Sequence, residues 1–144
     1  MRFSELSAVS QKAENYWVLT ESIDMSDIST PFELSEDAVV NGNGYTITNL
    51  TNPLFMHLFN CTITNIHFKD CQVTGENRKD YIGLLCRKFK LGKLESITVT
   101  NCQISSEVYS LGAIAGYIQQ TDCSDITISE SSINGDKNVG GLCG

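Results

Sequence analysis

Apolar residues recur in three similar segments in the second half of the chain. These segments are TNIHFKDCQV (64–73), ESITVTNCQI (95–104) and SDITISESSI (124–133), with equivalent positions 31 and then 29 residues apart. Within each segment the apolar residues stand two positions apart and most are β-branched, which is typical of β-strands. A fixed period of this length indicates a repeat architecture. We therefore expect Ile66, Ile97 and Ile126 to be equivalent residues of successive copies.

A second series precedes the first in each copy. It consists of IGLLC (82–86), LGAIA (111–115) and VGGLC (139–143), with PLFM (53–56) as a looser earlier copy. Successive copies can bury these residues against one another only if their strands lie parallel, about 4.8 Å apart. The pattern predicts an all-β fold, a right-handed parallel β-helix (β-solenoid), with the handedness that parallel crossovers prefer. Polar pairs predict its corners: Lys69-Asp70, Thr100-Asn101 and Ser129-Glu130.

The first 38 residues do not follow this repeat. Ser4 as N-cap, Glu5 in the first turn, and an apolar face of Phe3, Leu6 and Val9 predict a short capping helix over 4–13. Such a lid would cover the open end of the first coil, with Trp17 packed in the joint. Strands over 16–20 and 22–25 complete an irregular first turn. Residues 1–38 and the rungs of 39–144 together form a single domain, 1–144.

Several stretches resemble the GLUG-motif β-solenoids. They are YWVLTESIDMS (16–26), VVNGNGYTITNLT (39–51), and IGLLC, LGAIAG and VGGLCG, which alternate with strands of the ITVTNCQI type. GLUG motifs occur as repeats in large bacterial surface proteins, including regions beside IgA-cleaving peptidases. The resemblance implies a spacer or binding scaffold without catalytic residues. Family members are long and secreted, whereas this chain is short and MRFSELSAVSQKAENYW has no apolar core of signal-peptide length.

The cysteines and histidines indicate no metal or cofactor. Cys71 and Cys102 share one ladder position, Cys86 and Cys143 share another, and Cys123 corresponds to Ile63 and Leu94. Such positions suit small apolar side chains, so we expect reduced cysteines in the core. No C-x-x-C pair or His/Cys cluster is present, and His57 and His67 are expected at the surface.

Charge is unevenly distributed along the chain. Of the net charge of −7, nearly all lies in residues 1–40, where eight acids face two bases. Two surfaces are therefore predicted to contact partners. The alternative interpretation is that the acidic one is a solvated surface and that the basic one is a solvated loop whose charges protect a sheet edge from further pairing. The acidic cap comprises Glu21, Asp24, Asp27, Glu33, Glu36 and Asp37, and the basic shoulder comprises Arg78, Lys79, Arg87, Lys88, Lys90 and Lys93, with Phe89 available for stacking.

The sequence favours binding over catalysis. Enzymes built on β-helices draw their sites from several rungs, whereas this chain has about four, and the outward acids Asp70, Asp125 and Glu130 lack a basic partner. No run of 18 apolar residues predicts a membrane span. We expect a non-catalytic, protein-binding module: a small acidic intracellular inhibitor of phage or mobile-element type that blocks a surface on a larger partner, with nucleic-acid-binding proteins among the candidates.

The alternative is a fragment of a bacterial surface adhesin, serving as a stalk or glycan-binding segment. A complete chain would act in the host cytoplasm, and a fragment would lie at the cell surface or outside the cell. The final VGGLCG opens a further copy with nothing after it to cover it. A truncated chain, a second copy forming a homodimer, or another partner would each account for that open end.

Overall fold

The protein is all-β. The computed structural model describes residues 2–75, 81–106, 110–135 and 139–142. Within them, one short 3-10 helix, η1 (Phe3–Glu5), precedes the strands. The strands are β1 (Val9–Ala13), β2 (Tyr16–Leu19), β3 (Ile23–Asp24), β4 (Val39–Asn41), β5 (Thr46–Thr48), β6 (Phe55–Phe59), β7 (Thr62–Lys69), β8 (Gln72–Gly75), β9 (Tyr81–Ile82), β10 (Cys86–Lys90), β11 (Lys93–Thr100), β12 (Gln103–Ser106), β13 (Ser110–Leu111), β14 (Ala115–Gln119), β15 (Asp122–Ser129) and β16 (Ser132–Gly135).

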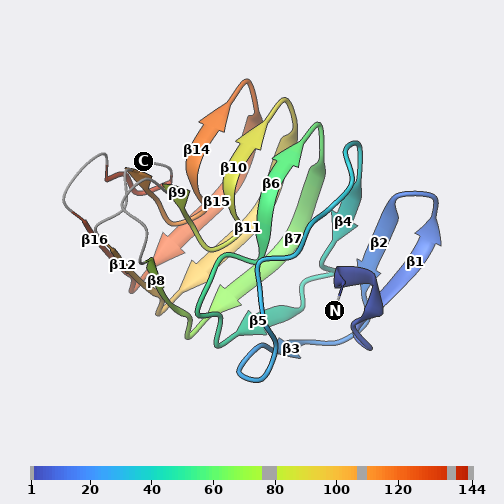
Figure 1. The fold of residues 1–144 in the computed structure, drawn as a ribbon, viewed down its shortest axis with the longest axis horizontal. Coiled ribbons are helices and arrows are strands. Elements are labelled where there is room, and N and C mark those ends of the chain that lie inside the picture. The colour runs from blue at the N-terminus through green and yellow to red at the C-terminus, as the bar shows by residue number, and fades with distance from the viewer. Residues whose placement is uncertain (1, 76–80, 107–109, 136–138, 143–144) are drawn as a thin grey trace.

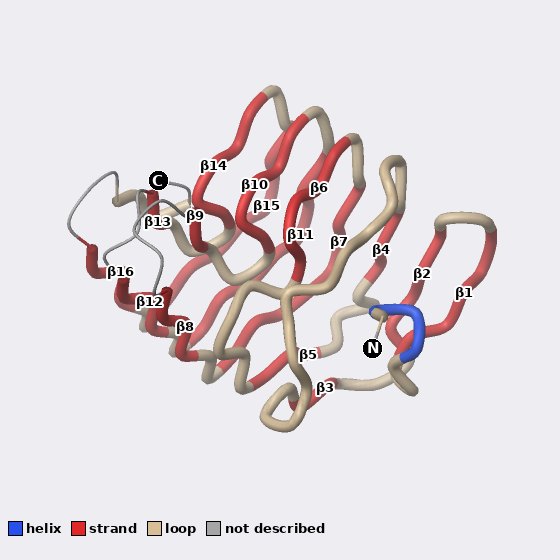
Figure 2. The backbone as a smooth tube through the Cα atoms, in the orientation of Figure 1, coloured by secondary structure: helices blue, strands red, loops and turns tan. Residues whose placement is uncertain are grey.

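Equivalent strands of successive copies lie side by side (Figure 1). The long sheet has the order β1-β2-β4-β7-β11-β15, with β3 and β5 alongside, while β6, β10 and β14 form the β10 sheet, and β8, β12 and β16 form the β12 sheet. Strands β9 and β13 form a small fourth sheet. Every pair of these strands is parallel except β1 with β2. In Figure 2, the loops that join β6 to β7, β10 to β11 and β14 to β15 also lie next to one another.

The register agrees with the alignment of the repeats. Ile66 pairs with Ile97, and Ile97 pairs with Ile126. We call one copy of the repeat a coil. Ile97 is completely buried, because a neighbouring coil covers it on each side, whereas Ile126 in the last described coil is only partly buried. The prediction that equivalent apolar residues share one interior is therefore confirmed. Their burial drives the stacking, at about 25 cal/mol for each Å² of apolar surface removed from water.

The predicted corners are also confirmed. Asp70, Asn101 and Glu130 have φ angles of 54°, 51° and 50°. This left-handed backbone costs most residues about 1–2 kcal/mol, and Asn and Asp tolerate it best. The polar residue in each copy therefore lets the chain turn sharply between the long sheet and the β12 sheet.

The helix predicted over 4–13 is wrong. Only Phe3–Glu5 is helical, and β1 instead pairs with β2 as an antiparallel hairpin, with Val9 opposite Leu19. Leu6 and Ala8 are buried while Ser7 is exposed, which is the alternation of extended chain. Phe3 covers the end of the core, since its ring lies 5.0 Å from that of Phe55.

The strands expected over 16–20 and 22–25 are present as β2 and β3. Trp17 on β2 packs against the core, but the 4–13 helix that it was expected to join to the strands is not formed. The final segment also pairs as expected, because Val139 bridges to Leu111. Val139 nevertheless keeps 44% of its surface exposed. Within the described residues, no helix has the length and apolar character needed to cross a membrane.

Candidate binding surface

The outer face of the β10 sheet presents basic and aromatic side chains in rows. Leu58 and Phe89 pair in register and point inward, where both are buried. Because side chains alternate along a strand, the residues on either side of Leu58 in β6 and of Phe89 in β10 point outward. His57, Lys88 and Tyr117 form one row across β6, β10 and β14. Phe59, Lys90 and Gln119 form the next row.

Aromatic rings hold the two lysines of this face in place. The Nζ atom of Lys88 lies 4.4 Å from the centroid of the Tyr81 ring, and that of Lys90 lies 5.7 Å from the Tyr117 ring. The two tyrosine rings meet edge to face, with centroids 5.9 Å apart. Cation–π contacts of this kind stabilise an exposed ammonium by about 0.5–1 kcal/mol. The rings therefore favour one placement of each lysine on this face.

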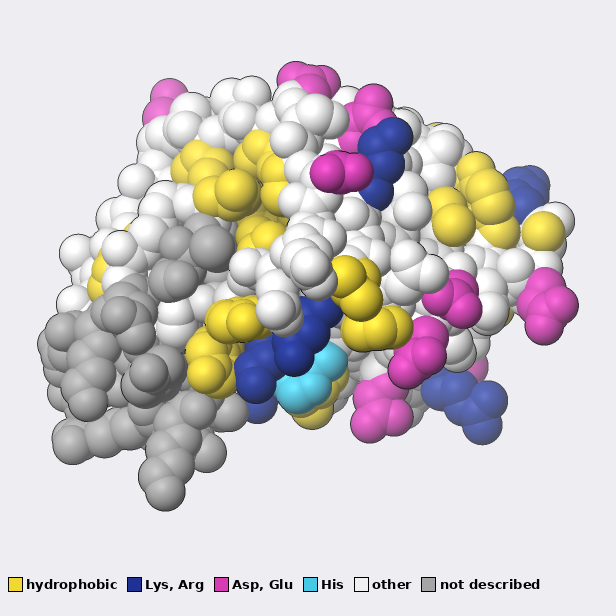
Figure 3. All heavy atoms as spheres, turned by 90° about the horizontal axis from the view of Figure 1, so that it is seen from above, with side chains coloured by type: hydrophobic (Ala, Val, Ile, Leu, Met, Phe, Trp, Pro, Cys, Tyr) yellow, Lys and Arg dark blue, Asp and Glu magenta, His cyan; other side chains and the backbone are white. Residues whose placement is uncertain are grey.

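We call this surface the basic–aromatic face and define it by His57, Phe59, Tyr81, Lys88, Lys90 and Tyr117. In Figure 3, Lys or Arg, His and apolar side chains gather next to one another, and acidic side chains lie beyond them toward the N-terminal coils. The arrangement suits an acidic partner, because the ammonium groups attract carboxylates while the rings offer apolar contact area.

The structure brings together only part of the predicted basic shoulder. Arg87, Lys88 and Lys90 lie on β10. Lys93 begins β11 after the corner and forms an ion pair with Glu95, at 3.1 Å between Nζ and Oε2. Arg78 and Lys79 lie outside the described residues. The expectation that Phe89 is available for stacking is wrong, since its side chain is fully buried as the inward residue between two lysines.

The aromatic members of the face were not predicted from the sequence. Tyr81 and Tyr117 come from different copies of the repeat, and they meet only when the coils stack. A signal was present in the spacing, because His57, Lys88 and Tyr117 are 31 and 29 residues apart, as are Ile66, Ile97 and Ile126. Extending the alignment of the long strands toward the N-terminus of each copy would have placed His57, Lys88 and Tyr117 in one row.

The six predicted acids lie in two places. Glu21 and Asp24 border a small hollow beside Leu6 and Ile23, and Asp27 follows shortly after. Asp24 accepts hydrogen bonds from the Asn49 amide and the Ser26 backbone N–H, both at 2.9 Å, and these lower the pKa of its carboxyl below the ordinary value.

The other three acids, Glu33, Glu36 and Asp37, follow Phe32 along the segment next to β6. Glu33 lines a larger cleft, and Asp37 accepts a hydrogen bond of 2.6 Å from the amide of Asn60. All three are exposed. The acidic cap is therefore divided between the β3 region and the first segment of the β10 sheet.

A family model described as the M26 IgA1-specific metallo-endopeptidase N-terminal region matches residues 30–101, which is half of the chain. The chain belongs to this family. The match begins just before Phe32 and ends after β11, so it includes β6 and β10 but not β14. No curated protein and no solved structure matches the chain.

The two histidines of the chain lie in different surroundings. Neither is followed by Glu, so the H-E-x-x-H zinc motif is absent from the sequence. His57 is exposed on the basic–aromatic face, whereas His67 lies partly buried in the long sheet with its Nε2 3.0 Å from the Thr100 hydroxyl. No group of three or more His, Cys, Asp or Glu suited to a metal occurs in the described parts of the chain.

Four of the cysteines occupy the core as predicted. Cys61, Cys71, Cys86 and Cys102 are buried free thiols, and burial raises the pKa of Cys61 and Cys86. Cys71 and Cys102 face each other across neighbouring coils: the hydrogen bond between the thiols lowers the pKa of Cys102 to about 7 and raises that of Cys71.

The remaining two cysteines differ from this pattern. Cys123 pairs with Leu94 in the ladder but is exposed, because no described strand covers β15 on its other side. The expectation of a core position is therefore wrong for Cys123. Cys143 lies outside the described residues.

Proposed function

We propose that the chain is a non-catalytic protein-binding module, built as a right-handed parallel β-solenoid, that holds an acidic partner protein on its basic–aromatic face. The parallel pairing of each coil with the next supports the solenoid. The rows of basic and aromatic side chains on the β10 sheet support the binding role.

The observation that carries this proposal is the row formed by His57, Lys88 and Tyr117. Three coils contribute one residue each, so the row exists only in the folded stack. Together with Lys90 in the next row, it places two lysines side by side on a protein whose net charge is −7. Opposite charges on a partner would steer it toward this face and away from the acidic N-terminal coils.

Two settings for such a module remain proposals. One is a small inhibitor that acts inside a host cell by blocking a surface on a larger protein. The other is a segment of a cell-surface protein of adhesin type, a stalk or glycan-binding module. The family is named for the N-terminal region of a peptidase, which is compatible with either setting.

Titration of the 15N-labelled protein with deca-glutamate, a model for an acidic protein surface, tests the proposal. We expect amide shift changes on β6, β10 and β14. Changing Lys88 and Lys90 to Ala should weaken binding by roughly tenfold, at about 0.7 kcal/mol for each exposed charge pair. Changing Lys12 and Lys69, exposed lysines of the long sheet, is the matched control and should leave binding unaltered.

Equal weakening by both pairs of substitutions would contradict the proposal, as would shift changes centred on the long sheet. A parallel titration with neutral oligosaccharides examines the glycan-binding alternative. Saturable shifts on the same face with sugar but none with deca-glutamate would favour that alternative instead.

Self-association through the last coil is a separate proposal. Ile126, Ile128 and Ile133 are only partly buried there, whereas Ile97, Val99 and Ile104 one coil earlier are fully buried. A second copy could cover them. Light scattering at increasing protein concentration measures this directly, and a constant monomer mass up to high concentration would contradict it.

A further inference from the structure

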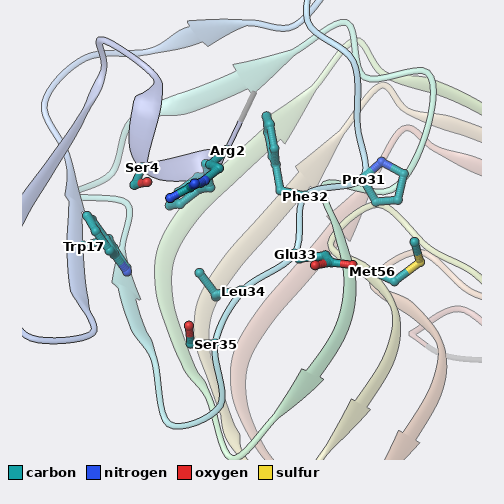
Figure 4. A pocket seen from close by; sticks show the side chains of 10 residues that line it. Arg2, Ser4, Trp17, Pro31, Phe32, Glu33, Leu34, Ser35 and Met56 are labelled. Carbon is teal, nitrogen blue, oxygen red and sulfur yellow. The ribbon is translucent and has the colours of Figure 1, made fainter.

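A cleft at the N-terminal end of the β10 sheet stands apart from the basic–aromatic face. It has a volume of about 790 Å³. Figure 4 shows η1 and Trp17 of β2 on one side and the segment 31–35 on the other. The lining residues are Arg2, Phe3, Ser4, Trp17, Pro31, Phe32, Glu33, Leu34, Ser35 and Met56.

The cleft borders residues 33–35, which follow the bridging residue Phe32 and lie outside any strand. Phe32 bridges to Phe55: its N–H donates to the carbonyl of Leu54 at 2.8 Å, and its carbonyl accepts from the N–H of Met56 at 2.9 Å. Because neighbouring residues of an extended chain direct their backbone groups to opposite sides, those of Glu33 point away from β6. Neither Glu33 nor Leu34 forms a backbone hydrogen bond to another described residue.

The first coil therefore contributes a strand, β2, to the long sheet, and among the described residues it contributes no equivalent strand to the β10 sheet. In the long sheet, β2 pairs in parallel with β4 and extends the stack by one coil. In the β10 sheet the pairing ends at Phe32 among the described residues, and the cleft lies where the next strand would be. A strand added there would lie about 4.8 Å from residues 33–35.

The charges around the cleft select a basic occupant. Glu33 lines it, and the exposed Glu36 and Asp37 follow on the same segment. Arg2 lies 3.6 Å from Glu5, measured from Nε to Oε1, so its charge is partly balanced. Trp17 offers a ring on which the aliphatic part of a Lys or Arg side chain can pack.

We propose that this cleft is an acceptor site for an extended peptide segment that carries Lys or Arg, which binds by adding a strand beside residues 33–35. The volume lies within the range of about 300–1,000 Å³ typical of ligand sites. The backbone of the peptide would pair with Glu33, and a basic side chain would reach the Glu33 carboxylate. The site is independent of the basic–aromatic face.

Trp17 is the only tryptophan of the chain, so its fluorescence reports directly on the cleft. The probe is acetyl-Lys-Val-Arg-Val-Lys-amide, and one control peptide carries Glu at each basic position. A second control is N-methylated at both valines, which removes two strand donors. We expect a saturable emission change with the basic peptide alone, together with slower hydrogen exchange at the Glu33 amide.

Glu33→Gln should weaken the basic peptide by about threefold, as expected for one exposed charge pair. Glu14→Gln, at an exposed acid of the β1–β2 turn that does not line this cleft, is the matched control and should have no effect. The proposal is overturned if the basic peptide causes no saturable change, if the N-methylated peptide binds equally well, or if the Glu33 amide exchanges at an unchanged rate.

Discussion

The side-chain amide of Asn101 donates a hydrogen bond of 2.7 Å to the carboxylate of Asp70, its equivalent one coil earlier. Asn49 and Asp24, and Asn60 and Asp37, are joined in the same way. Each bond connects neighbouring coils, and all of these residues except Asp24, which ends β3, lie at left-handed corners. The corners therefore contribute to the cohesion of the stack in addition to turning the chain.

Asn101→Ala should lower the free energy of unfolding by about 1–2 kcal/mol, because it removes this hydrogen bond and places alanine at a φ of 51°. Asn101→Gly loses the same bond but accepts the backbone, so we expect a loss of only about 0.5–1 kcal/mol. Urea unfolding followed by circular dichroism measures both. Equal losses would mean that the left-handed backbone is not a source of the effect.

The burial of equivalent residues predicts unequal costs of truncation. Ile97 is fully buried between two coils, whereas Ile126 is only partly buried. Ile97→Ala should cost about 3 kcal/mol, as for other large-to-small core changes, and Ile126→Ala about 1 kcal/mol. Chemical unfolding of the two variants tests this order. Costs of the same size would show that the last coil is as well covered in solution as the coil before it.

Two glycines provide a test of close approach between coils. A Cβ atom on Gly83 would lie 2.4 Å from the Cα and N atoms of Ala115 and from the carbonyl oxygen of Ile114, whereas one on Gly141 would meet nothing within 4 Å. Gly83→Ala should destabilise the protein by about 2 kcal/mol or more, since backbone atoms must move apart. Gly141→Ala should stay within about 0.5 kcal/mol of the parent protein in thermal unfolding.

Stability near the acidic limit should depend on Asp24. Hydrogen bonds, first of all from Asn49, lower the pKa of its carboxyl in the folded state below 3.8. The stabilisation is therefore present above pH 3.8 and is lost as the pH falls through the folded pKa. Asn49→Gly removes the amide while it accommodates the φ of 62° at this corner.

We expect the titration midpoint of Asp24 in Asn49→Gly to rise toward 3.8, as followed by 13C NMR of the carboxyl carbon. Asn101→Gly removes the corresponding amide at a different corner and should leave this midpoint where it is. An unchanged midpoint in Asn49→Gly would argue against the hydrogen bond as the cause of the lowered pKa.

Repetition made the regular part of the fold predictable from the sequence. Aligning Ile66, Ile97 and Ile126 gave the correct register of the long sheet, and Asp70 and Asn101 marked its corners. The N-terminal segment has no second copy against which to align it. There Ser4 as a possible N-cap and Glu5 in the first turn suggested a helix. In the structure, Val9 instead lies in strand β1, which pairs with β2.

The surface features could be predicted only in part. Lys88 and Lys90 stand out in the sequence as local charge, but Tyr81 and Tyr117 reach them through the fold. The cleft beside Glu33 depends on a strand that is lacking from one sheet of the first coil, and no local pattern indicates such a gap. Surface features built by residues from several coils cannot be deduced from any single stretch of the sequence.

The β1–β2 hairpin makes the two ends of the long sheet chemically unlike. Its outer strand reverses direction, bears the exposed Lys12, and carries an irregularity between Gln11 and Ala13. Bends and charges of this kind discourage a further strand from joining. Strand β15, at the opposite end, keeps the parallel direction, and Ile126 and Ile128 alternate there with Thr127 after the irregularity at Asp125, whose φ is 52°. Two copies joined through their β15 ends would leave a hairpin at each outer end, so such an assembly would stop at two.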